Sequence, residues 1–214
     1  MITGNYLVVD IETTKSNDAH EYAKNIIPPS NYKDEKKIAD YIAEKTTEWE
    51  SKTALSPLTG RICAIGTLLE YGGELPIENI EYDIEGNSEQ KLLKSFWKTL
   101  SSHNGHIVGH NIKGFDLPYL ILRSLKFNIT PSFYPTRNNY SQVIDTMDLW
   151  NMNRYPKEFI SLDMFARFLG VGMKTGSGEM FYDTLKSDKE SALKYLANDL
   201  HLTNNVFKKF IYLL

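Results

Sequence analysis

The chain has 214 residues, of which 42% are hydrophobic and 24% charged, and its formal net charge is −3. This length suits one α/β domain with an insertion and allows a full hydrophobic core. The single cysteine, Cys63, excludes an internal disulfide and fits a reducing compartment. We find no secretion leader and no run of eighteen apolar residues, so we expect a cytoplasmic protein without a membrane span.

The segment NYLVVDIET, residues 5–13, is apolar and free of Gly and Pro, which predicts a buried central strand. Side chains alternate along a strand, so Asp10 and Glu12 project from the same face. Two like charges on one face are unfavourable unless a cation lies between them. An exposed edge strand with solvated acids is the alternative, and the apolar neighbours argue against it.

Residues 15–60 form an insertion that is much longer than a hairpin turn. Within it, residues 34–55 contain good helix formers and predict a helix with Ile42 and Trp49 on one side. The insertion is either an arm that covers a bound ligand or a helix that packs on the edge of the sheet. We favour the second interpretation, because Ile42 and Trp49 need a place to be buried.

Two further strands and a helix are predicted next. Residues 61–70 and 77–85 indicate the strands, and the sequence YGGE between them indicates a hairpin turn. Residues 88–100 indicate a helix that Ser88 opens. We expect its inward side chains to be Leu92, Leu93, Phe96, Trp97 and Leu100.

The segment HIVGHNIKGFDLPYLILRSLKF predicts a strand over 106–112 and a helix over 116–126. Asp116 would stand at the N-terminus of this helix, where an acid is a common cap. That explanation requires neither an amide nor an aromatic residue nearby. Asn111 and Phe115 therefore favour a functional role for this segment over a simple cap.

A fifth strand is predicted within residues 140–150, followed by a short helix over 161–172 and a Gly-rich connection over 173–180. Asp145 and Asp148 lie near the fifth strand. Asp148 could cap a turn, and Asp145 could lie behind residues that contact a metal and support them. We therefore expect neither acid to bind a metal directly.

The C-terminal segment from about 188 to 214 predicts a helix with one apolar stripe, because its large apolar residues recur in steps of three and four. Asp199 lies beside this stripe, and Tyr195, four residues earlier, lies on the neighbouring turn of the same flank. Such a helix would pack its stripe on the sheet and direct Asp199 toward the strand ends. A solvated flank is the alternative for this pair taken alone.

The motifs DIETT, GHNIKGFDLPYL and YLANDLHLT resemble those of the DEDDy branch of DnaQ-like 3′–5′ exonucleases. The form N-x-x-x-F-D is most similar to the proofreading exonuclease of family B DNA polymerases. The resemblance extends from residue 5 to about residue 205. It implies a ribonuclease H-like α/β fold, in which helices flank a mixed five-stranded sheet and the insertion lies between strands one and two, all in a single domain over 1–214.

The resemblance also implies the metal site. Two divalent cations, Mg²⁺ or Mn²⁺, would be held by Asp10, Glu12, Asp116 and Asp199, and Tyr195 would orient the attacking water. Two such cations can activate a water and stabilise the leaving oxygen of a phosphodiester.

For the substrate, the resemblance implies that Asn111, Phe115 and the backbone around Thr13 hold the 3′-terminal nucleotide. The related DEDDh branch has a histidine five residues before the last acid. Lys194 occupies that position here, which supports the DEDDy assignment.

We therefore expect a metal-dependent 3′–5′ exonuclease that releases nucleoside monophosphates from single-stranded or frayed DNA, alone or with a DNA polymerase in trans. The alternatives are an exoribonuclease and a catalytically idle module that binds single strands or a polymerase. Discrimination at the 2′-hydroxyl depends on local contacts that sequence does not show.

Basic residues are concentrated over 111–174, which has eight Lys and Arg against five Asp and Glu. With interleaved aromatic residues, such as Tyr134, Tyr140 and Tyr155, this mixture suits a single-strand path. Ordinary surface cations and core aromatics explain any one residue equally well. The basic residues are Lys113, Arg123, Lys126, Arg137, Arg154, Lys157, Arg167 and Lys174.

Overall fold

The structure is a computed structural model that describes all residues except 1–4, 24, 72–74, 137, 138, 153, 155 and 214. Arg137 and Tyr155 lie outside the described residues, as does the predicted YGGE turn except for its first residue, Tyr71. The chain forms two compact units, Met1–Glu12 with Ile62–Leu214, and Thr13–Arg61. Along the described residues, no helix has both the length and the apolar character needed to cross a membrane.

Five strands form one mixed sheet, in the order β3-β2-β1-β4-β5. Strand β2 pairs antiparallel with β3, while β4 pairs parallel with both β1 and β5. The strands are β1 Tyr6–Lys15, β2 Gly60–Glu70, β3 Ile77–Tyr82, β4 His106–Gly109 and β5 Val143–Asp145. The predicted five-stranded mixed sheet is thus confirmed.

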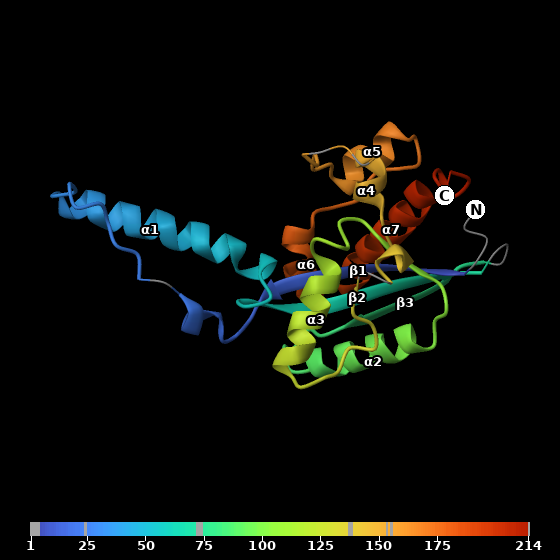
Figure 1. Ribbon diagram of the computed structural model, residues 1–214. Coiled ribbons are helices and arrows are strands. Elements are labelled where there is room, and N and C mark those ends of the chain that lie inside the picture. The colour runs from blue at the N-terminus through green and yellow to red at the C-terminus, as the bar shows by residue number, and fades with distance from the viewer. Residues whose placement is uncertain are drawn as a thin grey trace. The chain divides into compact units, whose positions relative to one another are not determined.

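Helices cover both faces of this sheet, and Figure 1 shows α2 and α3 on the opposite side from α7. The helices of the first unit are α2 Glu89–Ser101, α3 Asp116–Lys126, α4 Thr146–Asn151, α5 Leu162–Phe168, α6 Phe181–Ser187 and α7 Lys189–Lys208. Single 3₁₀ turns occur at Ala19–Tyr22, Thr53–Leu55, Tyr140–Gln142 and Gly178–Met180. The α/β class is confirmed.

Alternation along β1 decides which helix each side chain meets. Leu7, Val9 and Ile11 belong to the core that α2 and α3 complete. Tyr6 and Val8 belong to the opposite core, which α7 completes. All five strand residues are buried, so β1 is central with both faces covered, as its apolar composition predicts.

Helix α2 fits its prediction, since Leu92, Leu93, Phe96, Trp97 and Leu100 are all buried. The hydroxyl of the residue at its cap position, Ser88, makes no capping bond.

Asp83 instead holds the turn that leads into α2. Its carboxylate accepts the backbone N–H groups of Gly86 at 3.0 Å and Ser88 at 2.9 Å.

A buried ion pair joins α2 to α3. The guanidinium of Arg123 is 2.6 Å from the Glu89 carboxylate, and both side chains are buried. Glu89 also accepts the backbone N–H of Ile62 at 2.9 Å. Arg123 is therefore a structural residue, and its expected place on a surface path for nucleic acid is wrong.

The last helix is shorter than predicted, because α7 ends at Lys208. After it, backbone bonds join residues three apart, as between Phe210 N–H and Phe207 O at 2.8 Å. This tighter winding accompanies the packing of the Phe210 ring 5.9 Å from the ring of Phe165.

In the second unit, helix α1 spans Glu35–Lys52, close to the predicted 34–55, and no residue of it is buried. The expectation that Ile42 and Trp49 become buried is therefore wrong. Ile42 is exposed, and a lysine covers Trp49, since Lys15 Nζ lies 5.5 Å from the ring centre. Lysine side chains can shield apolar surface in this way while their ammonium groups stay hydrated.

Candidate metal centre

The alternation of β1 places two acids on the α7 side of the sheet. Asp10 and Glu12 continue the series of Tyr6 and Val8, whose side chains face α7. Asp10 is partly buried and Glu12 is buried. The sequence therefore builds a strand whose first half fills the core and whose second half presents carboxylates.

Asp199 completes a compact acidic group with these two residues. One carboxylate oxygen from each of Asp10, Glu12 and Asp199 lies within 4.8 Å of the others. The apolar stripe of α7 packs on the sheet through residues such as Leu196 and Leu200, and this packing fixes the rotation that directs Asp199 inward. Asp199 is buried and not part of a solvated flank.

Asp116 lies beside this group and approaches it from the other helix layer. It is the first residue of α3, whose cap position is occupied by Phe115 without a side-chain capping bond. The Asp116 carboxylate instead accepts the backbone N–H of Ile11 at 3.1 Å. The simple cap interpretation of Asp116 is thus wrong, and its side chain reaches β1 between Asp10 and Glu12.

Burial and mutual repulsion both disfavour ionisation of these acids. Burial raises the pKa of Asp10 well above its usual value, and the charges of Asp116 and Asp199 raise it further. Burial likewise raises the pKa of Glu12, and the charge of Asp10 adds to the effect. Burial also raises the pKa of Asp116 to about 7, although the Ile11 N–H opposes the shift. A bound cation would reverse this preference by stabilising the carboxylates.

Lys174 is the counter-charge within the protein, and the sequence did not single it out for this role. Its Nζ lies 2.5 Å from a carboxylate oxygen of Asp199 and 5.0 Å from the centre of the Tyr195 ring. Burial raises the pKa of Asp199, and the Lys174 ammonium opposes that rise. The available signal was a lysine within the Gly-rich connection, which is too common to identify the contact.

Tyr195 lies one helical turn before Asp199 and is buried. Burial raises the pKa of its hydroxyl, and the negative charges of Glu12 and Asp199 raise it further. The hydroxyl therefore stays protonated at neutral pH. Among the described residues it makes no hydrogen bond of ordinary geometry, although it lies close enough to the Asp199 carboxylate to lower the pKa of that group.

Two glycines bring the backbone close to this tyrosine. A Cβ on Gly176 would lie 3.1 Å from a Tyr195 ring carbon. A Cβ on Gly178 would lie 3.4 Å from Glu12 Oε2 and 3.7 Å from the Tyr195 hydroxyl. The predicted Gly-rich connection thus passes directly along the acidic group, and larger residues would crowd it.

The donor set fits a hard divalent cation. The compact group offers only carboxylate oxygens, which suit Mg²⁺ or Mn²⁺. One oxygen of Asp199, Oδ1, is buried and lacks a hydrogen-bond partner among the described residues. An unpaired buried carboxylate oxygen is costly, and a cation is the partner that such an oxygen can use. These residues could therefore hold metal.

The predicted nucleotide-binding residues lie on the turn that leads to Asp116. Asn111 follows β4 with a left-handed φ of +58°. The ring of Phe115 packs 5.4 Å from that of Tyr119 and against the core beneath α3. Thr13 begins the second unit, and its role stays a prediction.

Several of the basic residues over 111–174 pair with acids in the structure. Lys113 and Lys157 both contact Asp148, at 3.1 Å and 2.5 Å. Arg167 contacts Asp163 at 2.8 Å. These partly exposed cations are available to a phosphate backbone only in exchange for their present partners.

Comparison with known proteins identifies the family. The family model described as predicted 3′–5′ exonucleases related to the exonuclease domain of PolB matches residues 55–213. A DNA polymerase of Phaeocystis pouchetii virus is 36% identical over 73 residues, which are 34% of this chain and 7% of the viral protein. The chain thus spans a small part of that relative.

The fold agrees with this match. The family B DNA polymerase of the hyperthermophilic archaeon Pyrobaculum calidifontis is similar with a TM-score of 0.62 and 18% identity, over 97% of this chain and 24% of that chain. The predicted resemblance to a PolB-like exonuclease and its fold are thus confirmed, and they support nuclease function and nucleic-acid binding in broad terms. The chain belongs to the family of predicted 3′–5′ exonucleases related to the exonuclease domain of PolB.

Proposed function

We propose that the protein is a metal-dependent 3′–5′ exonuclease acting on single-stranded or frayed DNA and releasing nucleoside 5′-monophosphates. The observation that carries this proposal is the convergence of Asp10, Glu12 and Asp199 oxygens within 4.8 Å, beside Asp116. Four acids from three separate elements lie together along the middle of β1. Four acids facing the single ammonium group of Lys174 leave an excess of negative charge, which is unfavourable without cations.

Each residue has a distinct role in this proposal. Asp10, Glu12, Asp116 and Asp199 hold two Mg²⁺ or Mn²⁺ ions. When bound, the metals supply an activated water and stabilise the leaving oxygen of the phosphodiester. Tyr195, protonated and buried, donates or accepts a hydrogen bond that orients the water.

Asn111, Phe115 and the backbone around Thr13 hold the 3′-terminal nucleotide in this scheme. The similar proteins are DNA polymerases by name, so we favour DNA over RNA and action with a polymerase in trans or alone in repair.

The direction of degradation tests the function. A 5′-labelled single strand is expected to shorten as a one-nucleotide ladder, and a 3′-phosphate is expected to slow the reaction. Denaturing gels resolve the ladder. A single internal cut at early times would indicate an endonuclease, and faster loss of RNA of equal sequence would indicate the exoribonuclease. No cleavage of either strand with Mg²⁺ or Mn²⁺ would favour the catalytically idle module.

Substitution of Tyr195 by phenylalanine separates orientation of the water from metal binding. The variant keeps the buried ring and loses only the hydroxyl, so turnover should fall roughly ten- to a thousand-fold, as expected for one positioned hydrogen bond. Affinity for Mn²⁺ and for single strands should change little. Single-turnover rates and calorimetric Mn²⁺ titrations measure the two effects.

Asp199→Asn provides the contrast, because it should weaken Mn²⁺ binding and recover only partly at high Mn²⁺. Wild-type single-turnover rates in Tyr195→Phe would show that the tyrosine is a packing residue. The exonuclease proposal would survive that result.

A further inference from the structure

The turn between β4 and α3 has an unusual backbone that needs support. Asn111 has a φ of +58°, in the left-handed region that glycine adopts most readily and asparagine more readily than most other residues. Its carbonyl accepts the backbone N–H groups of Gly114 at 3.0 Å and Phe115 at 2.9 Å. A Cβ on Gly114 would lie 2.5 Å from the Asn111 side-chain oxygen, so glycine makes room for this amide.

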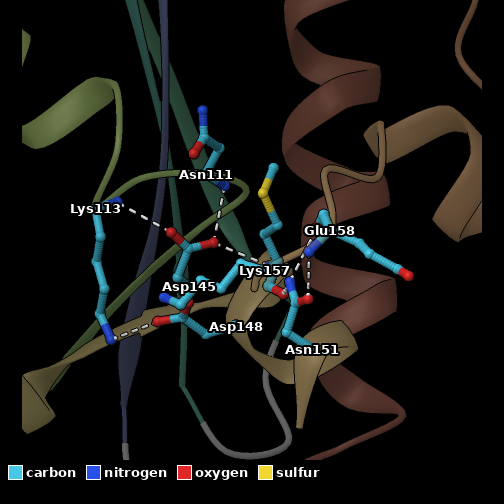
Figure 2. Close-up of polar contacts among 8 residues, drawn as sticks. Asn111, Lys113, Asp145, Asp148, Asn151, Lys157 and Glu158 are labelled. Carbon is cyan, nitrogen blue, oxygen red and sulfur yellow. Dashed lines mark hydrogen bonds and ion pairs between the residues drawn. The ribbon is translucent and has the colours of Figure 1, made fainter. Parts of the chain in front are cut away.

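Asp145, at the end of β5, holds this turn from beneath. Its carboxylate accepts the backbone N–H groups of Asn111 at 2.8 Å and Lys113 at 3.0 Å, as Figure 2 shows. Its carboxylate also accepts the N–H of Met147, in the first turn of α4, at 2.9 Å and so caps that helix. Asp145 is 4% exposed, so these bonds form away from solvent and have the strength of charge-assisted bonds.

The number of bonds distinguishes Asp145 from an ordinary helix cap. A cap at the start of α4 requires only the Met147 bond. The other two bonds reach across the sheet edge to residues 34 and 32 positions earlier in the chain. They fix both sides of Ile112, which is fully buried, and so leave the turn little freedom.

Asp148 strengthens the same connection on the outer side. Its carboxylate is 3.1 Å from Lys113 Nζ, so two acids of β5 and α4 bind one lysine at its backbone and at its side chain (Figure 2). Asn111 and Phe115, which carry the proposed nucleotide contacts, are thereby tied to β5 and not only to β4.

We propose that Asp145 is a positioning residue for the 3′-terminal nucleotide. It touches neither substrate nor metal in this scheme; it sets the backbone from which Asn111 and Phe115 reach the nucleotide. The inference rests on the proposed function, because that function makes these two residues nucleotide contacts.

Asp145→Asn is the direct test. The amide has the size of the carboxylate, but one of its two oxygens is replaced by an NH₂ group. At least one backbone N–H of the turn then faces another donor, and that hydrogen bond is lost. A displacement of about 1 Å at a reacting nucleotide can lower turnover on the order of a hundredfold. We therefore expect kcat to fall roughly ten- to a hundredfold, with overall strand affinity changed by less than about threefold, because backbone charges dominate that affinity.

Fluorescence of 2-aminopurine gives a readout that loss of stability alone would not change. A single strand with this base at its 3′ end is titrated with protein in Ca²⁺, with gels verifying that the strand stays intact. The wild type should alter the emission of the terminal base, and Asp145→Asn should lose most of that change. The matched control is Asp83→Asn, a buried acid that binds two backbone N–H groups at the opposite edge of the sheet. It should lower the melting temperature while kcat and the fluorescence change stay at wild-type values.

The outcomes separate this inference from the proposed function. Asp145→Asn with wild-type kcat and a wild-type fluorescence change would overturn the positioning role. Equal losses in Asp83→Asn would overturn it as well, since they would reflect stability alone. A wild type that binds the strand but does not hydrolyse it would contradict the exonuclease, while the fluorescence comparison would still test Asp145. If Asp145→Asn does not fold, Asp145→Glu, which keeps the charge but shifts it by one methylene, is measured in the same way with the same expected direction.

Discussion

Alanine at Asp10 is expected to lower the rate of 3′-end hydrolysis by several orders of magnitude. Asp10 lies in the compact acidic group and beside Asp116, so its loss removes one of the four proposed metal ligands. Single-turnover degradation of a 5′-labelled strand in saturating Mn²⁺ measures the effect. Asp116→Ala should show a loss of the same size.

Stability should move in the opposite direction. Burial and neighbouring charges raise the pKa of Asp10 well above normal, which means that its ionised form weakens the folded state. In EDTA at neutral pH, Asp10→Ala should therefore melt at the wild-type temperature or above it. Asp183→Ala, at an exposed position in α6, is the matched control and should keep the wild-type rate. A fully active Asp10→Ala protein would exclude the proposed metal site.

Removal of divalent cations is expected to abolish activity completely. The compact group contains only carboxylate ligands, so Mg²⁺ or Mn²⁺ should restore the rate after EDTA treatment, and Zn²⁺ should restore it poorly. Metal that binds only the folded protein also stabilises it, by roughly 2.7 kcal/mol at a hundred times the dissociation constant. Thermal melting with and without Mn²⁺ measures this shift independently of activity.

The same titration on Asp10→Ala supplies the control, because the variant should lose most of the Mn²⁺-dependent rise in melting temperature. Undiminished degradation in EDTA would contradict the two-metal proposal, even if the polarity of degradation were 3′ to 5′. An equal rise in both proteins would place the stabilising metal at some other site.

The sequence predicted on which face of their elements Asp10, Glu12 and Asp199 lie, because local periodicity determines the face of each side chain. A period of two on β1 required Asp10 and Glu12 to share a face, and the apolar stripe of α7 required Asp199 to lie beside the sheet. The buried side chains of α2 followed from the same rule. These features depend on neighbours along the chain, which a sequence displays directly.

Periodicity could not predict contacts between segments that are distant in the sequence. The pairing of Lys174 with Asp199 and the binding of the Asn111 turn by Asp145 join residues 25 and 34 positions apart, with no periodic signal to reveal them. Arg123 appeared to be a surface cation because nothing near it in sequence indicates Glu89. The exposure of α1 was missed for a different reason, since a lysine and a second tyrosine shield its aromatic rings where a core was expected.

The two ends of the second unit lie close together, which has a consequence for protein engineering. Ser16 N–H and Thr59 O are joined at 2.9 Å, so the chain leaves and re-enters the strands at nearly one point. No residue of α1 is buried, and Ala19 is the one buried apolar residue among the described residues between these two positions, so this segment can be exchanged at little cost to a hydrophobic core. A short turn could replace it, or a reporter domain could be inserted there, and natural variants of very different length would be tolerated for the same reason.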